Sequence, residues 1–331
     1  LPIVIAKGRG AWVWDNEGRK YLDCLSAYSA VSQGHCHPKI RAALIGQSKR
    51  LTIPSRGFYN DQLPVFLDKI CRLCGYEMAL PMNSGSEDVE TAIKIARKWG
   101  HVIKKIPRDQ GEIIVCDGNF HGRTITIISF SSHAPYREDF GPLTPGFKRI
   151  PFGDISALEQ AIGPQTIGFL IEPIQGEGGV NVPPPGYLKA AQDLCKKNNV
   201  LFMVDEIQTG LGRTGKILAF QHDTQQKPDL IMLGKALSGG YYPVSCVLAD
   251  RSLMDLIQPG DHGSTFGGNP LAAAIGTAAL DVLVDEQLTE RAHALGQELL
   301  HAMRETRSEI VTEVRGRGLM IGVEIAPQFG T

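Results

Sequence analysis

The sequence predicts an α/β protein in which helices cover a mostly parallel β-sheet. Between about residue 38 and residue 260, short apolar runs alternate with segments of helical periodicity. That alternation is typical of sheets whose parallel strands are joined by helices. At 331 residues the chain exceeds the usual span of one hydrophobic core, so a second, smaller domain is expected.

Each element follows from a local pattern. A β-hairpin is predicted over residues 11–23, which flank a turn at Asn16, Glu17 and Gly18. Continuous apolar runs predict strands at 112–116, 167–172, 200–206, 230–233 and 244–249. Apolar residues at helical spacing predict helices over 87–99, 186–198, 270–284 and 288–304.

The pattern also predicts how the chain is divided. The last helix leads to an apolar run at 319–325 that we predict to be a strand, which indicates a small α+β domain at the C-terminus. We therefore expect an N-terminal segment with the hairpin (1–28), a large domain (29–275) and a small domain (276–331). Because Leu1 is not a methionine and the chain stops just after the last predicted strand, the sequence is expected to continue at both ends.

The composition favours small-molecule partners. With 43% hydrophobic and 21% charged residues and a net charge of −1, the chain has no overall field that would attract nucleic acid or anionic lipid. No apolar run approaches the roughly 18 residues of a membrane span. Seven cysteines at scattered positions do not resemble a disulfide framework and favour a reducing compartment. We expect a cytoplasmic location, or the mitochondrial matrix if the source is eukaryotic.

Polar residues follow two of the predicted strands at the sheet edge where ligands bind in such folds. Asp205 ends the apolar run 200–204, and Lys235 comes two residues after the run 230–233. We therefore expect an acid and a lysine to project from neighbouring strand ends. From the spacing alone, an ion pair or a solvated lysine explains the pattern equally well.

Small residues precede two helices and form candidate phosphate sites. Gly85 allows close backbone approach, and Ser86 offers a hydroxyl beside free N–H groups at a helix start. Taken alone, N-capping by serine is the more common explanation. Ser264 and Thr265 lie in a similar loop before the helix at 270. Phe120 follows a strand end and can stack on a planar ligand, although a single phenylalanine more often belongs to a core.

No metal site is expected. His35, Cys36 and His37 lie on one short segment, and alternate residues of such a segment do not surround an ion without distant ligands. Cys71 and Cys74 have no second pair at zinc spacing and fall in a helical pattern, which indicates packing.

Several segments together resemble the class III, fold type I aminotransferases that depend on pyridoxal 5′-phosphate (PLP), and within that family the ornithine aminotransferases. The resemblance covers essentially the whole chain. It implies the PLP-transferase fold type I, whose large domain has a mostly parallel seven-stranded sheet, together with a homodimer in which the two active sites are shared. The segments that carry it are 26–40, 80–100, 118–124, 172–180, 204–215, 233–240 and 262–272.

The resemblance implies a role for each matching residue. Lys235 would bond covalently to PLP and later carry a proton, which requires a neutral amine and hence a lowered pKa. Asp205 would pair with the pyridine nitrogen and keep it protonated. Gln208 would hydrogen-bond to the phenolic oxygen of the ring. The other cofactor-binding residues implied are Gly85, Ser86, Phe120, His121, Ser264 and Thr265, the last reaching the phosphate from the other subunit.

Three further residues are implied to contact substrate. Tyr28 matches a tyrosine that lies near ornithine, and Arg123 would bind the distal carboxylate of 2-oxoglutarate. Glu177 matches a glutamate that masks an arginine during one half of the reaction, and in the family that arginine lies in a C-terminal region outside this sequence. One departure is the acid Asp88 where the family has a small residue, which we expect to affect the start of the helix more than the chemistry.

The resemblance therefore predicts transfer of the δ-amino group of L-ornithine to 2-oxoglutarate, giving glutamate 5-semialdehyde and glutamate. A close alternative is an aminotransferase acting on acetylornithine or another ω-amino acid. An alternative from a different class is a catalytically silent protein that keeps the fold. A dehydrogenase fits less well, because no glycine loop follows a first strand.

Overall fold

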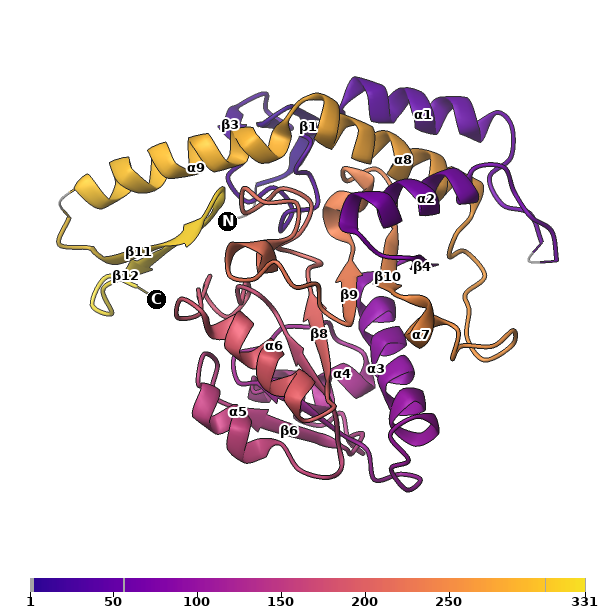
Figure 1. Ribbon diagram of the computed structural model, residues 1–331. Coiled ribbons are helices and arrows are strands. Elements are labelled where there is room, and N and C mark those ends of the chain that lie inside the picture. The colour runs from indigo at the N-terminus through magenta and orange to yellow at the C-terminus, as the bar shows by residue number, and fades with distance from the viewer. Residues whose placement is uncertain (1–2, 56, 307, 331) are drawn as a thin grey trace.

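A computed structural model describes residues 3–55, 57–306 and 308–330. Its centre is a seven-stranded sheet in the order β4-β10-β9-β8-β7-β5-β6 (Figure 1). β10 runs antiparallel to both of its neighbours, and the other pairs are parallel. The predicted fold class is thereby confirmed. The strands are β4 (Met78–Met82), β5 (Glu112–Cys116), β6 (Phe147–Ile150), β7 (Thr166–Ile171), β8 (Leu201–Asp205), β9 (Leu230–Leu233) and β10 (Ser245–Ala249).

Five of these strands are the five predicted from apolar runs, whereas β4 and β6 were not predicted. β7, β8, β9 and β10 are buried along their whole length, because helices cover both faces of the sheet, and such strands read as continuous apolar runs. β4 contains Pro81 and β6 contains Lys148 and Arg149, and both are edge strands. Polar residues and proline are tolerated there.

The two faces of the sheet are covered by different helices. Ile113 and Met203 belong to the apolar cluster beneath α3 (Gly85–Val102), and Ile114 and Phe202 to the cluster beneath α6 (Tyr187–Lys197). This alternation is the two-residue period of a strand with both faces buried. The remaining α-helices are α1 (Pro38–Ser48), α2 (Leu63–Cys74), α4 (Ile125–Ser129), α5 (Ile155–Ala161), α7 (Arg251–Met254), α8 (Pro270–Asp285) and α9 (Leu288–Glu305).

Smaller sheets lie near the two ends of the chain. The predicted hairpin is confirmed as β2 (Trp12–Asp15) and β3 (Lys20–Leu22), with β1 (Ile5–Arg9) as an additional strand. At the other end, α9 is followed by the antiparallel hairpin of β11 (Val311–Arg317) and β12 (Met320–Ile325), which confirms the predicted last strand. Figure 1 shows α8 and α9 at the end of the molecule opposite α5 and β6. The three-part division of the chain stays a prediction.

The cysteines form no disulfides among the described residues. All seven are free thiols, and Cys71 and Cys74 lie in α2 as predicted. His35 is hydrogen-bonded to Asp23 (2.7 Å), and His37 is paired with Glu286 (3.2 Å). Among the described residues, no helix combines the length and the apolar character that crossing a bilayer requires.

Asp88 is a fully buried acid in the first turn of α3, packed against β10. Burial raises its pKa well above the ordinary value, the Ser245 hydroxyl and the Cys246 backbone oppose that rise, and the charges of Asp205 and Glu87 add to it. Neither of its carboxylate oxygens makes a hydrogen bond of standard geometry within the described part of the chain. Ionising Asp88 in the folded state is therefore unfavourable.

We expect Asp88→Asn to stabilise the protein at neutral pH. The folded-state pKa lies above the unfolded value of about 3.9, so wild-type stability falls as the pH rises from that value towards the folded pKa, and asparagine abolishes this loss. The expected gain in the free energy of unfolding is roughly 1–3 kcal/mol near neutral pH. Urea unfolding of both proteins at several pH values measures it.

The same comparison with the exposed Glu298→Gln is the control, and this change is expected to leave stability unaltered. A gain for Asp88→Asn that shrinks towards acidic pH supports the burial argument. An equal loss of stability at every pH would instead mean that the carboxylate makes contacts the fold requires.

Candidate active site

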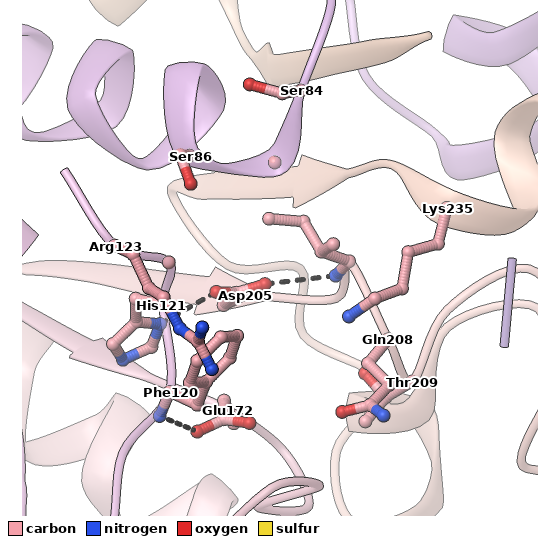
Figure 2. A pocket seen from close by; sticks show the side chains of 13 residues that line it. Ser84, Ser86, Phe120, His121, Arg123, Glu172, Asp205, Gln208, Thr209 and Lys235 are labelled. Carbon is pink, nitrogen blue, oxygen red and sulfur yellow. Dashed lines mark hydrogen bonds and ion pairs between the residues drawn. The ribbon is translucent and has the colours of Figure 1, made fainter. Parts of the chain in front are cut away.

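A cavity of about 360 Å³ opens at the carboxyl ends of β8 and β9. This is the edge where parallel sheets bind ligands, and the volume lies within the range of about 300–1,000 Å³ for small-molecule sites. Figure 2 shows its side chains converging on one space. The lining residues are Ser84, Gly85, Ser86, Phe120, His121, Gly122, Arg123, Glu172, Asp205, Ile207, Gln208, Thr209 and Lys235.

Lys235 enters this cavity two residues after the end of β9. Its backbone has φ +44°, a left-handed conformation that is unfavourable for a residue with a β-carbon and that often marks a functional position. In Figure 2 its side chain points into the cavity from the side opposite Phe120 and His121. Burial lowers the pKa of the amine, although the charges of Asp205, Glu172 and Glu177 oppose the shift. The neutral, nucleophilic form is therefore more accessible than in a solvated lysine.

Asp205 is the last residue of β8 and is almost fully buried. One carboxylate oxygen is 2.7 Å from Nδ1 of His121, and the other accepts the Ile207 N–H at 3.0 Å. Burial opposes a charge on His121, but the hydrogen bond to Asp205 and the charges of Asp205 and Glu172 outweigh it and raise the pKa of the histidine. The carboxylate is thus held in one orientation at the cavity wall.

The loop after β5 supplies an aromatic ring and a guanidinium. Phe120 lies edge-on to Tyr136, with ring centroids 6.1 Å apart. The Arg123 guanidinium lies 5.8 Å from the Phe120 ring and 4.7 Å from the Tyr136 ring, and it donates to the Tyr136 hydroxyl at 3.3 Å. Since Arg123 is exposed, the positive charge stands at the rim of the cavity.

The first turn of α3 forms another wall and serves two purposes. Ser84 is the N-cap and forms a capping box with Glu87, so the N-capping alternative holds for Ser84. Gly85 and Ser86 line the cavity, where helix-start N–H groups have no partner within the helix. A β-carbon at Gly85 would come within 2.8 Å of Ile207, and one at Gly122 would collide with the Ser86 hydroxyl. The glycines therefore leave a cradle for an anion.

Glu172 and Thr209 line the cavity although the sequence did not single them out. Glu172 follows β7 directly, as Asp205 ends β8, so its place at a strand end was the available signal. Burial raises the pKa of Glu172 to about 7, with His121 lowering it, Asp205 raising it, and the Phe120 and Gly176 N–H groups lowering it. The Thr209 hydroxyl donates to the buried Glu206 at 2.5 Å.

Four residues implied by the resemblance lie outside the lining of this cavity. Tyr28 is 51% exposed, in a run of left-handed residues from Ser26 to Ser29. Glu177 is exposed and acts on Lys235 through its charge. Ser264 accepts hydrogen bonds from the Asn83 amide (2.7 Å) and the Gly267 N–H (3.1 Å), and Thr265 is exposed. The roles of these four residues stay predictions.

The donor set of the cavity fits PLP. The cradle at α3 suits a phosphate, the fixed carboxylate of Asp205 suits a protonated ring nitrogen, and Phe120 offers an aromatic ring. Lys235 offers an amine with a lowered pKa. One cavity thus presents a partner for each functional part of that cofactor.

The match to the aminotransferase class III family covers residues 1–330, and the chain belongs to that family. An ornithine aminotransferase of Brevibacillus brevis is 55% identical over 98% of this chain and 81% of its own. An ornithine aminotransferase structure from Toxoplasma gondii, described as having partial PLP occupancy at its active site, has a TM-score of 0.97 and 49% identity over 99% of this chain and 78% of its own.

A third relative carries a different substrate name. The acetylornithine aminotransferase structure of Elizabethkingia anophelis has a TM-score of 0.86 and 49% identity, and the match covers 98% of this chain and 79% of that one. The family predicted from the sequence motifs is confirmed by the family match and by these relatives.

Proposed function

We propose that this protein transfers the δ-amino group of L-ornithine to 2-oxoglutarate with PLP as its cofactor. The observation that supports this proposal most strongly is that Lys235, Asp205 and the anion cradle of α3 line the same cavity. The names of the B. brevis and T. gondii relatives favour ornithine as the donor.

The residues divide the work of holding the cofactor. The N–H groups at the start of α3 and the Ser86 hydroxyl would bind the phosphate. Asp205, whose carboxylate is held by His121 and the Ile207 N–H, would accept the hydrogen bond of the ring nitrogen. When bound, PLP supplies an electron sink for charge that develops on the amino acid.

Lys235 would form the covalent bond to the cofactor and then act as the proton carrier. Both tasks require a neutral amine within reach of the reacting atoms. Burial of its side chain favours that form, and the surrounding carboxylates keep the amine from losing its proton affinity altogether. The opposing effects suit a group that must both take up and release a proton near neutral pH.

The substrates would meet charges at the rim. Arg123, steadied by Tyr136, would bind the distal carboxylate of 2-oxoglutarate. Glu177 would repel that carboxylate unless its own charge is paired. Tyr28 would contact ornithine.

The protein would act as a homodimer with shared sites. Thr265 is exposed and lies outside the cavity of its own chain, and in a homodimer it would reach the phosphate in the other subunit. Large apolar side chains, including Phe58, Tyr59 and Phe266, are at least half exposed, as an apolar contact between copies requires. The seven free thiols support a reducing location such as the cytoplasm.

The test is an assay of the purified protein, loaded with PLP, against L-ornithine and N-acetylornithine with 2-oxoglutarate as acceptor. We expect ornithine to react with the higher kcat/KM. The E. anophelis relative makes acetylornithine the second candidate donor. Faster turnover of N-acetylornithine would make that compound the proposed amino donor. No turnover with either donor or with other ω-amino acids would favour a protein that keeps the fold without catalysing the reaction.

Tyr28→Ala is expected to lower kcat/KM for ornithine by about tenfold and to change that for 2-oxoglutarate little, because a tyrosine that contacts the donor is lost while Arg123 remains. Separate half-reaction kinetics with each substrate measure the two values. Thermal unfolding of the variant controls for a folding defect. Equal losses for the two substrates would mean that Tyr28 serves packing alone.

A further inference from the structure

Glu172 is a buried acid that faces the cavity but has no part in the chemistry proposed above. It follows β7 directly and is the first residue of one of two loops that meet at the cavity wall. One loop runs from 117 to 123 after β5, and the other from 172 to 181 after β7. Figure 2 shows its carboxylate beside the backbone of Phe120.

Its first hydrogen bond holds the aromatic loop. Oε1 of Glu172 accepts the backbone N–H of Phe120 at 2.9 Å. The following residue, His121, binds Asp205, and Arg123 stands at the rim two residues further on. This hydrogen bond therefore fixes the backbone from which the Phe120 ring and the Arg123 side chain extend.

Its second hydrogen bond lies within its own loop, four positions further along the chain. Oε2 of Glu172 accepts the N–H of Gly176 at 3.2 Å. A β-carbon on Gly176 would overlap the side-chain amide of Gln208, so this backbone is the surface on which Gln208 rests. Glu177, the residue that acts on Lys235 by its charge, comes next.

Two further side chains, Gln175 and Arg315, also hold these loops. Gln175 donates to the Asp117 carbonyl at 2.6 Å, which also joins the two loops, and Arg315 from β11 donates to the Gly179 carbonyl. Glu172 joins the two loops from a position that lines the cavity, whereas Gln175 and Asp117 join them outside that lining.

We propose that Glu172 is a positioning residue that sets the spacing between the loop carrying Phe120 and Arg123 and the loop supporting Gln208 and Glu177. This inference rests on the proposed function. Because the first loop carries Phe120 and Arg123, and the second supports Gln208 and carries Glu177, Glu172 governs PLP binding and both half-reactions together. It acts through backbone N–H groups and touches neither substrate.

A carboxylate is required because two N–H groups donate to its two oxygens. Glutamine has the same shape but a single acceptor oxygen, so one N–H loses its partner and faces an NH₂ group instead. Aspartate keeps both oxygens on a side chain one methylene shorter, which brings them to one loop at a time. We therefore expect the two hydrogen bonds of residue 172 to weaken progressively from glutamate through aspartate and glutamine to alanine.

Glu206→Gln is a matched control. Glu206 is also a buried acid at a strand end, its pKa is also raised to about 7 by burial, and it also accepts a backbone N–H, that of Phe220 at 2.9 Å. It does not line the cavity, and Thr209, the cavity residue that donates to it, has no role in the proposed function. Both changes disturb a buried carboxylate to a similar degree, but only one of them disturbs the two loops.

The first measurement is PLP binding by the cofactor-free protein, followed by fluorescence, with the visible circular dichroism of the bound cofactor. Glu172→Gln is expected to weaken PLP binding about tenfold and to reduce the dichroism, since one buried hydrogen bond is lost. Glu206→Gln is expected to bind PLP as the wild type does. If Glu172→Gln does not fold, Glu172→Asp replaces it, with a smaller loss in the same direction.

The second measurement is kcat/KM for donor and acceptor separately, and a common loss of about tenfold to a hundredfold is expected. Unchanged PLP affinity, or an equal effect of Glu206→Gln, would overturn the proposal, as would a loss confined to one substrate. If the wild-type protein binds PLP but does not react with ornithine, the proposed function is wrong in its donor. The PLP affinities of the variants would then still decide the role of Glu172.

Discussion

Replacing Lys235 with alanine is expected to abolish transamination while leaving the fold intact. The amine is the group that bonds to the cofactor and carries the proton, and the loss of such a group lowers kcat by about 10⁴-fold or more. The variant removes a half-buried amine whose pKa is lowered by burial, so no loss of stability is expected.

Covalent attachment gives a readout that does not depend on turnover. After borohydride reduction with PLP, the wild-type protein is expected to gain the mass of one cofactor at Lys235, and Lys235→Ala to gain none at the cavity. Lys216→Ala, a change at an exposed lysine, is the control and should behave as the wild type does. Turnover retained by Lys235→Ala would show that another group performs the chemistry.

The central sheet was predictable because its strands are buried on both faces. A strand such as β8, with Phe202 and Met203 facing opposite apolar clusters, has no polar position, and the acid that ends it therefore stands out in the sequence. Lys235 stands out in the same way after β9. The edge strands β4 and β6 lack this contrast, because proline and charged residues are tolerated where one side meets solvent.

The rest of the site depends on contacts between distant segments. The local signal for Glu172 is its place at a strand end, which other acids such as Glu206 share, and its importance comes from the Phe120 N–H that tertiary folding brings to it across 52 positions. The pairing of His121 with Asp205 is likewise a contact across 84 positions. Tyr28 and Thr265 lie outside the lining of this cavity, and their roles stay predictions.

Asp205→Asn is expected to give a protein that still binds PLP but reacts slowly. The asparagine oxygen can accept the Ile207 N–H, so the loop after β8 keeps its anchor, and the phosphate cradle is untouched. The amide has no charge to hold a proton on the ring nitrogen, and the electron sink is weakened. The pKa of His121 is expected to fall as well, because its hydrogen bond and charge interaction with Asp205 raise it in the wild type.

The expected loss in kcat for Asp205→Asn is about 10²–10⁴-fold, with a much smaller change in PLP affinity, because the missing charge acts in the transition state more than in binding. Asp229→Asn is the matched control. Asp229 accepts the Phe202 N–H at 2.8 Å, at the opposite end of the same strands, so its replacement should lower stability and spare turnover. Parallel losses of PLP affinity and kcat in Asp205→Asn would mean that the carboxylate only holds the cofactor. Another group would then have to keep the ring nitrogen protonated.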